Sequence, residues 1–423
     1  MKRLMISLFF HLILLPGILM GQNNEPQQRI KGWQSDIDTL LSLIKKEHYV
    51  YKAKILPEEM LSNVKILRKK IGEYSDERML GELERVMYYL QDGHSYILPV
   101  STKFQSFYLP LQFYIFDNGV FIIDADEPYK DLIGSKVLSI NNISISKLLS
   151  DMNTYVHQDN KFTVKWFAPS VLRFRGVYEY YGLKAGSPEI EMGLSTKEKK
   201  KYIQNISFVP ATNFRGIPKL IPSKAETSNP PPLYLSDVEN YYWFKRIPDK
   251  KAIYIQFNQV LNKEHGQTLF QFGNSIDSVL HVDKPKLLII DVRHNNGGSL
   301  EYLQTLVQAI KNFDQQQKSA KIIVITGRNT FSAAQVFISQ LNRDTHAIFA
   351  GEPSSSSPNF VGEENYFVLP YSKAVVSISN KYHETIPGDK RKWIEPNFPV
   401  LLSSSEYFKN QDPVLEYVLK KIK

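Results

Sequence analysis

The chain has 423 residues, of which 43% are hydrophobic and 22% are charged, close to the average of globular domains. This composition predicts two to three domains and excludes a disordered chain, a collagen and a polytopic membrane protein. The formal charge of +9 comes from dispersed basic residues, which favours a solvated surface over nucleic-acid binding. The absence of cysteine excludes disulfides, thiolate nucleophiles and cysteine-ligated metal centres.

The first 21 residues have the pattern of a secretory signal peptide. Lys2 and Arg3 precede an apolar run from Leu4 to Leu15, and polar residues begin at Gln22. The run is short for a membrane span, with an uncleaved N-terminal anchor as the alternative. We therefore expect a mature protein that starts near Gln22 and lies in the periplasm or outside the cell, with no stable membrane span.

Apolar residues recur with helical spacing from about residue 30 to residue 92. A helix is predicted to begin at Ser75, a plausible N-cap, and to end at Gly93, a plausible C-cap. From Phe107 to about Val156 the spacing changes to that of strands. Residues 157–247 show little regular pattern, and no function is assigned to them.

From Ala252 onward, short apolar strands alternate with helices. Strands are predicted at 252–257, 287–291, 322–325, 347–350 and 375–378, and helices at 269–280, 300–313, 332–341 and 412–422. This alternation favours parallel βαβ units. Ligands of such sheets bind at the carboxyl ends of the strands, so the residues that follow each strand are the candidates for chemistry.

Two strand ends stand out. The strand that ends at Asp291 leads into a turn with Gly297 and Gly298, whose free amides could hold an oxyanion, although a ligand-free tight turn is the alternative. The next strand leads to Ser332 at the start of a helix, where the amide of Ala333 would favour developing negative charge. This placement is similar to a nucleophile elbow, with an ordinary N-cap serine as the alternative.

A serine nucleophile needs a base. Among the histidines, His94 is the best placed, because it follows an apolar helix and a glycine; a lone surface histidine is the alternative. His294 lies in the glycine turn, but its neighbours indicate a surface role. The sequence has no metal-binding motif such as H-E-x-x-H, so we expect no metal site.

Together these segments resemble the tail-specific and C-terminal processing peptidase family, and in particular its tricorn-like secreted branch. The matching segments are Asp92-Gly93-His94, a PDZ-like stretch at 132–141, a D-x-R-x-N-x-G-G pattern from Asp291 to Gly298, Ser332-Ala333-Ala334, Gly351-Glu352 and Ile394-Glu395-Pro396-Asn397. The resemblance implies an α/β fold with an N-terminal helical region, a PDZ-like β-rich middle and a C-terminal serine-peptidase core of crotonase-like βαβ units.

The resemblance also implies roles for particular residues. Ser332 corresponds to the nucleophile, and the amides of Gly297 (or Gly298) and Ala333 correspond to the oxyanion hole. His94 corresponds to the general base of the tricorn-like branch. No cofactor is implied, and the partner is a polypeptide substrate.

One departure from the family pattern bears on the base. Processing peptidases carry a lysine after the Gly-Glu pair, but the segment after Gly351-Glu352 contains no lysine. The resemblance therefore favours His94 over a Ser–Lys dyad. Glu395 is the candidate for the acidic residue that this branch carries near its C-terminus.

The sequence predicts five parts. They are a signal peptide at 1–21, an N-terminal helical region at 22–100 with His94, a degenerate PDZ-like region at 105–156, an irregular connecting segment at 157–247 and a catalytic core at 248–423. We expect a secreted serine endopeptidase. A catalytically inactive peptidase-like protein that binds peptides or apolar ligands is the first alternative, and a hydrolase of non-peptide esters or amides is the second.

Overall fold

The computed structural model describes residues 26–98, 101–211, 220–221, 223 and 229–421. The predicted signal peptide and its cleavage point near Gln22 lie outside the described residues. Within the described ranges, no helix is both long and apolar enough to cross a membrane.

Three helices form the N-terminal part of the described chain. They are α1 (Pro26–Glu47), α2 (Glu58–Lys70) and α3 (Asp76–Met87), and the 3-10 turn η1 (Tyr88–Leu90) follows α3. The predicted N-cap of α3 is confirmed, because the Ser75 hydroxyl accepts a hydrogen bond from the Arg78 amide at 3.1 Å. The apolar faces of the three helices share one core, which includes Trp33, Leu40 and Leu83.

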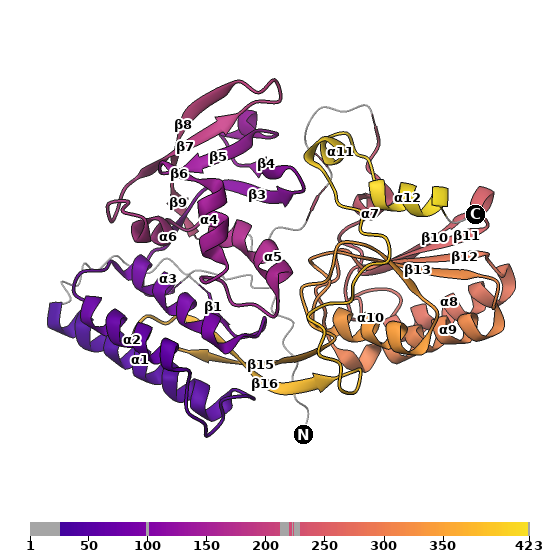
Figure 1. Cartoon of the computed structure of the whole chain (residues 1–423), viewed down its shortest axis with the longest axis horizontal. Helices are drawn as coiled ribbons and strands as arrows, with labels where there is room; N and C mark the ends of the chain where they lie inside the picture. The colour runs from indigo at the N-terminus through magenta and orange to yellow at the C-terminus, as the bar shows by residue number, and fades with distance from the viewer. Residues whose placement is uncertain (1–25, 99–100, 212–219, 222, 224–228, 422–423) are drawn as a thin grey trace.

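A long hairpin from the C-terminal third of the chain completes this N-terminal body. Its strands β15 (Asn359–Val368) and β16 (Val375–Glu384) pair with β1 (Tyr96–Ile97) in the order β1-β16-β15. Val376 and Ile378 of the hairpin belong to the same core as the helices. Figure 1 shows the hairpin running from the right-hand part of the molecule to the N-terminal helices α1 and α2. Residues 359–384 therefore lie apart from the rest of the segment predicted as the catalytic core.

An antiparallel sheet occupies the middle of the chain. Its strands are β3 (Leu111–Phe116), β4 (Gly119–Ala125), β5 (Lys136–Ile140), β6 (Ile143–Ser144), β7 (Glu189–Ser195) and β8 (Lys201–Ser207). Short elements beside it are β2 (Phe107–Tyr108), which pairs with β9 (Val209–Pro210), and η2 (Lys130–Leu132). The PDZ-like character of this region stays a prediction.

The segment 157–247 is not the irregular connector that its composition indicates. It supplies β7 and β8 to the middle sheet and two helices, α5 (Lys161–Val171) and α6 (Arg175–Tyr180), which join α4 (Ile145–Met152). Side chains of the helices and strands share one core. The sequence pattern is hard to read there because β8 alternates only weakly and α5 carries Pro169 in its interior.

The C-terminal sheet confirms the predicted βαβ units. Its strands are β10 (Tyr242–Ile247), β11 (Ala252–Phe257), β12 (Leu287–Asp291), β13 (Lys321–Thr326) and β14 (Ile348–Gly351), in that order. β10 is antiparallel, and the other four are mutually parallel. The crossover helices are α8 (Leu269–Asp283), α9 (Gln304–Gln316, preceded by η5, Leu300–Tyr302) and α10 (Ala333–Asp344).

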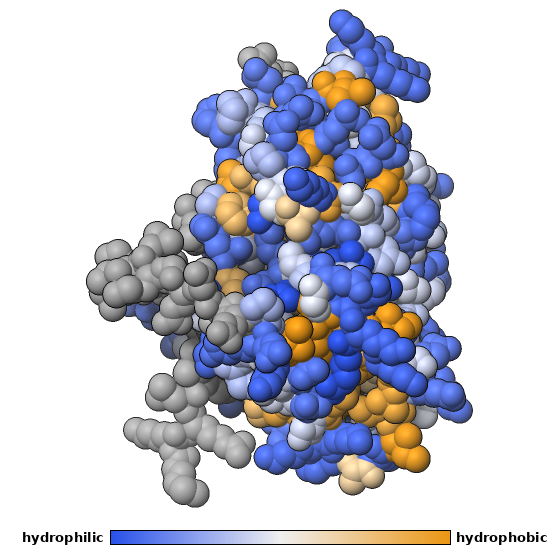
Figure 2. All heavy atoms as spheres, turned by 90° about the vertical axis from the view of Figure 1, so that its left-hand side faces the viewer, coloured by the Kyte–Doolittle hydropathy of each residue, from blue (hydrophilic) through white to orange (hydrophobic). Residues whose placement is uncertain are grey.

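Helices cover both faces of this sheet. In Figure 1, α8, α9 and α10 lie together below it, and α12 (Pro413–Lys421) lies above it. Smaller elements are α7 (Leu233–Ser236), η4 (Pro248–Lys250) and α11 (Ser404–Phe408). The exterior seen in Figure 2 is largely hydrophilic, with apolar side chains in small separate groups. The sheet is thus a buried scaffold that holds the ends of β12 and β13 in fixed positions.

Candidate active site

Ser332 lies between β13 and α10 in a strained backbone conformation. Its φ is 55° and its ψ is −124°, a combination that residues with a side chain rarely adopt. Its hydroxyl makes no capping hydrogen bond to α10. The ordinary N-cap alternative is therefore wrong. A serine on a sharp, strained turn from strand to helix is the geometry of a nucleophile elbow.

The glycine turn after β12 packs directly against this serine. Gly297 has a φ of 109°, and a Cβ atom placed on it would lie 2.7 Å from the Cβ of Ser332 and 3.0 Å from the amide nitrogen of Ala333. No side chain fits there. The glycine is needed because the two backbones approach each other closely.

Asn295 ties the two turns together. Its side-chain oxygen accepts the Gly297 amide at 3.0 Å, and its backbone oxygen accepts the Phe331 amide at 3.1 Å. The Gly297 amide is thus engaged within its own turn. Among the described residues, the amides of Gly298 and Ala333 donate to no protein acceptor, so these two remain available to a ligand.

His94 lies in a turn that a buried carboxylate organises. The helical segment ends at Gln91, whose φ is 53°, two residues before the predicted cap Gly93. Asp92 then accepts the amides of His94 and Ser95 at 2.9 and 2.6 Å. The turn is therefore set by a side chain that is 1% exposed.

Two further groups hold Asp92. Nε2 of His48 lies 2.8 Å from one oxygen, and the Ser379 hydroxyl of β16 donates to the other at 2.8 Å. Burial by itself would raise the pKa of Asp92, but the hydrogen bonds from His48 and Ser379 lower it to about 2. The Asp92 carboxylate thus connects the ends of α1 and α3, the His94 turn and the hairpin.

The His94 ring is buried beside the serine turn. It stacks on Phe331, the residue before Ser332, with centroids 4.2 Å apart, and on Phe360 with centroids 5.3 Å apart. Neither ring nitrogen has a hydrogen-bond partner among the described residues, so the Ser332 hydroxyl is not hydrogen-bonded to the ring in this structure. Burial lowers the pKa of His94, which favours the neutral imidazole that a general base requires.

A carboxylate that the sequence pattern does not reveal faces this ring. An oxygen of Glu364, on β15, lies 4.0 Å from Nε2 of His94. Glu395 lies elsewhere, on an exposed loop, where it accepts a hydrogen bond from Nε1 of Trp393 at 2.5 Å. Glu364 gives no signal in the sequence because it follows a second glutamate in an exposed strand, with no motif around it.

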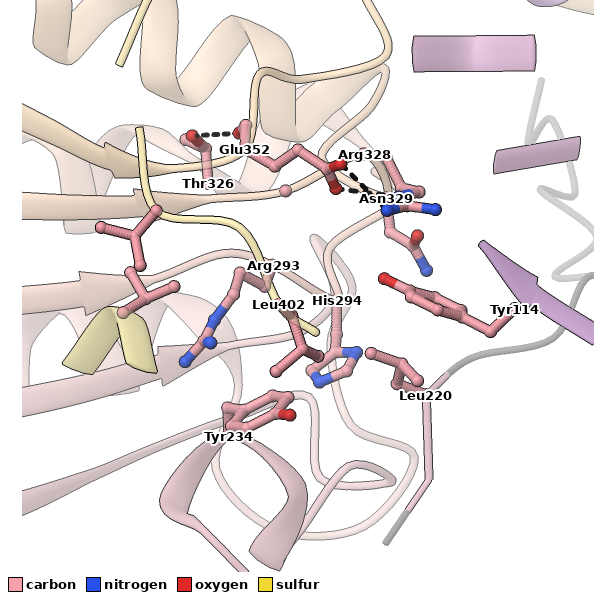
Figure 3. Close-up of a pocket in the computed structure, with 13 residues that line it drawn as sticks. Tyr114, Leu220, Tyr234, Arg293, His294, Thr326, Arg328, Asn329, Glu352 and Leu402 are labelled. Carbon is pink, nitrogen blue, oxygen red and sulfur yellow. Dashed lines mark hydrogen bonds and ion pairs between the residues drawn. The ribbon is translucent and has the colours of Figure 1, made fainter. Parts of the chain in front are cut away.

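Arg293 of the D-x-R-x-N-x-G-G pattern is held by two aspartates. It binds the carboxylates of Asp291 and Asp412 at 2.6 Å each and lies over the ring of Tyr234 (Figure 3). Burial would lower the pKa of Arg293, but the two aspartates raise it well above its ordinary value. This arginine fixes the strand end and α12.

The predicted surface role of His294 is wrong. Its ring is 3% exposed and stacks on Tyr234 with a centroid distance of 5.8 Å. Together with Arg328 and Glu352 it lines a small pocket of about 50 Å³, drawn in Figure 3. The pairing of Arg328 with Glu352 at 2.8 Å closes one side of this pocket.

Buried serines occupy the segment where a processing peptidase would carry its lysine. Ser354, Ser355 and Ser356 are each at most 1% exposed. The Ser356 hydroxyl accepts a hydrogen bond from the Ser332 amide at 3.3 Å, so this segment helps to hold the strained turn. Lys165 of α5 binds Glu352, next to this segment.

Asp159 joins the start of α5 to the His94 turn. Its carboxylate accepts the Gly93 amide at 3.0 Å. Burial, and then the charge of Asp92, raise the pKa of Asp159 to about 7. Three regions of the chain thus meet at His94 and Ser332.

No family model and no curated protein matches the chain. Among solved structures, mature CPAF in complex with lactacystin matches with a TM-score of 0.64 and 13% identity, over 93% of this chain and 97% of CPAF. A CPAF mutant matches with a TM-score of 0.64 and 14% identity, over 93% and 96%. Tricorn protease matches with a TM-score of 0.42 and 14% identity, over 92% of this chain and 36% of its own.

The chain has the fold of the tail-specific and C-terminal processing peptidase group, to which CPAF belongs. The expectation of a mixed α/β architecture of this type is therefore confirmed. At 13–14% identity the likeness shows the fold, and the chemistry must be argued from this chain's own residues.

Proposed function

We propose that the chain is a serine-type peptidase that hydrolyses peptide bonds in polypeptide substrates. The observation that carries the proposal is the strained conformation of Ser332 with the glycine turn packed against it. Strained backbone of this kind persists only where the surroundings enforce it, and it clusters at active sites. An ordinary turn would not need it.

In the proposed reaction, the Ser332 hydroxyl oxygen attacks the scissile carbonyl while His94 takes its proton. The amides of Gly298 and Ala333 receive the oxyanion that develops on the carbonyl oxygen. His94 then protonates the leaving amine, and water attacks the acyl-enzyme by the same route in reverse. Glu364, rather than Glu395, is the carboxylate that orients and stabilises the imidazolium.

The reacting groups must come closer than they do in this structure. His94 is held flat between Phe331 and Phe360, with neither nitrogen bonded to a described residue. Catalytic hydrogen bonds are often long or absent without substrate and form in the substrate complex. We propose that substrate binding shifts Phe331 and brings the imidazole to Ser332.

The same clamped histidine favours a second candidate, a peptidase-like protein that binds peptides or apolar ligands without cleaving them. A fluorophosphonate probe separates the two, because only an activated serine is labelled. The peptidase proposal expects labelling of the intact protein and none of Ser332→Ala. Absence of labelling in folded wild-type protein would leave the binding protein, and labelling with turnover of esters but not of peptides would indicate the non-peptide hydrolase.

Ser332→Ala is a clean control in this test. Both residues carry a Cβ atom and suffer the same backbone strain, and the Ser332 hydroxyl caps no helix amide. We expect its thermal stability to be nearly unchanged. Export by the N-terminal segment belongs to the same proposal, and N-terminal sequencing of exported material near Gln22 tests it.

A further inference from the structure

A largely apolar cavity of about 250 Å³ adjoins the candidate active site. Its walls come from α3, α5, α6 and β1, elements that lie side by side in Figure 1. Gly93, Asn296 and Phe331 also line it, and these residues directly precede His94, Gly297 and Ser332. The cavity therefore opens where a substrate residue next to the scissile bond would place its side chain.

Four side chains on the cavity wall carry polar atoms without a partner among the described residues. They are Nε2 of His157, Nε1 of Trp166 and the hydroxyls of Ser106 and Ser170. Each of these residues is only 5–6% exposed. A buried polar group without a partner costs about 1–3 kcal/mol. These four atoms are closed to a water-sized probe, so a ligand that supplies the missing hydrogen bonds must draw these side chains toward the cavity.

The His157 ring has a defined polarity. Its Nδ1 lies 2.6 Å from Glu84, and the other oxygen of Glu84 accepts the Ile97 amide at 2.7 Å. A neutral ring whose Nδ1 proton is donated to Glu84 carries a lone pair at Nε2. His157 is thus a hydrogen-bond acceptor, whereas the indole N–H of Trp166 can only donate.

We propose that this cavity is a side-chain subsite that selects tyrosine in the substrate. This inference rests on the proposed peptidase function and adds its substrate class. The phenol hydroxyl donates to Nε2 of His157 and accepts from Trp166 or from the hydroxyl of Ser170, one helical turn away on α5. A cavity of about 150 Å³ holds a benzene ring, so a phenol ring fits the volume here.

Charge argues against two other occupants. Glu77, Glu84 and Glu364 line the cavity, so a free carboxylate is disfavoured there. Glu77 and Glu84 already have partners, in Arg175 and His157, and Glu364 faces His94 at 4.0 Å. A lysine or arginine side chain would gain little from them, and its charge would have to be desolvated among aromatic rings. A neutral aromatic ring with one hydroxyl matches both the apolar wall and its polar atoms.

The first experiment measures kcat/KM for four peptides that differ only in Tyr, Phe, Leu or Arg at one position beside the scissile bond. We expect tyrosine to exceed phenylalanine about 30-fold, as two net hydrogen bonds of about 1 kcal/mol each allow. Trp166→Phe or Ser170→Ala, whichever removes the donor that the phenol uses, should lower this ratio about fivefold. The exposed Ser150→Ala is the control.

These two variants are chosen because they remove a hydrogen-bond donor without unpairing a buried charge. His157→Ala would leave the buried carboxylate of Glu84 without its partner and could unfold the protein. Equal turnover of the tyrosine and phenylalanine peptides, or a preference for leucine or arginine, would overturn the proposal. So would an unchanged ratio in both variants.

A second measurement does not need catalysis. Binding of N-acetyl-tyrosine amide and N-acetyl-phenylalanine amide to Ser332→Ala protein is followed by titration calorimetry. Preference for the tyrosine compound, lost when Trp166→Phe or Ser170→Ala is added, supports the subsite even if no peptide is ever cleaved. Peptide cleavage without a tyrosine preference in either assay would contradict the subsite proposal alone, and the peptidase proposal would remain.

Discussion

Ser332 and His94 belong to two regions that are built in different ways. The serine stands on the parallel sheet, where β12, β13 and the turns that follow them supply Gly297, Gly298 and Ser332 from one stretch of about fifty residues. The histidine stands on a body assembled from α1 to α3, β1 and a hairpin that returns nearly three hundred residues later in the chain. Local sequence positions the first, and long-range packing positions the second.

This difference has a consequence for the chemistry. The serine turn is held by hydrogen bonds between the two strand ends, such as those that Asn295 accepts from the amides of Gly297 and Phe331. The His94 turn depends on Asp92, whose partners His48 and Ser379 come from α1's end and from β16. Substitutions around His94 should therefore lower activity by displacing the imidazole. Substitutions around Ser332 should lower it by acting directly on the nucleophile and the oxyanion-binding amides.

The largest effect is expected from His94→Ala. We expect kcat to fall by a factor on the order of 10³ or more, as loss of a triad member does, while Ser332 keeps its conformation. Because burial lowers the pKa of His94, the base stays neutral at lower pH, so wild-type activity should rise with pH through a midpoint below 6.5. Steady-state kinetics across pH measure both.

Two lysines are the controls for the identity of the base. Lys373 in the hairpin turn is the first lysine after Ser332 in the sequence, and Lys165 binds Glu352. Lys373→Ala and Lys165→Gln should leave the pH midpoint unchanged. An activity that keeps rising past about pH 9, with near-normal turnover in His94→Ala, would show that a lysine is the base. The region around His94 would then not contribute a reacting group.

The next effect is expected from Gly297→Ala, which drives a methyl group into the serine turn. A Cβ atom there lies 2.7 Å from that of Ser332, so we expect a destabilisation of about 1–3 kcal/mol and a loss of activity of about 10²-fold, as a small misplacement of a catalytic group produces. Chemical denaturation and kinetics give the two numbers.

Gly388→Ala is the matched control for the backbone cost. Gly388 also has a positive φ, 72°, but a Cβ atom placed on it would meet no other atom within 4 Å. The variant should lose stability by about 1–2 kcal/mol and keep full activity. Equal kinetics in the two variants would mean that the glycine turn does not contact the reacting serine.

Much of the serine side could be predicted from the sequence. The strands and helices of the parallel sheet, the glycine turn and Ser332 all follow from local apolar runs and small residues. Their functional residues lie close together in the sequence because the carboxyl ends of adjacent parallel strands lie at the same edge of the sheet. The strain at Ser332 could not be predicted, since it arises from the close packing of Gly297 and from Ser356 behind the turn.

Little of the histidine side beyond His94 itself could be predicted. Glu364 lies some 270 positions along the chain from His94 and reaches it only because the hairpin pairs with β1. Likewise, part of the cavity wall comes from α5 and α6, in a segment whose sequence shows no clear helical or strand periodicity. Contacts that depend on tertiary pairing leave no local signal, so the sequence motif indicates Glu395 and not Glu364.

Glu364→Gln tests that pairing directly. The carboxylate lies 4.0 Å from His94 and is about a third exposed, so we expect kcat to fall about 10- to 100-fold, less than the roughly 10⁴ lost with a buried, bonded triad carboxylate. Its charge raises the pKa of His94, so removal should move the pH midpoint further down. Glu395→Gln should change neither value, and the reverse result would restore Glu395 as the acidic partner.

The smallest effect is expected from Asp159→Asn, and it concerns stability. Burial and the charge of Asp92 raise the pKa of Asp159 to about 7, above its ordinary value of 3.8. A group whose pKa is raised on folding contributes stability that is present below its unfolded pKa and is lost as the pH rises through the folded value. At pH 8 the ionised carboxylate therefore opposes folding, because it faces Asp92 where the His94 turn meets α5.

Asparagine keeps an oxygen for the Gly93 amide but carries no charge. We expect Asp159→Asn to be more stable than wild type by about 1–2 kcal/mol at pH 8, with the gain vanishing near pH 4. Urea denaturation at both pH values measures it, and the exposed Asp131→Asn should show no such trend. A variant that is less stable than wild type at pH 8 would mean that the ionised carboxylate holds the His94 turn in place, and the histidine side would then depend on charge as well as on packing.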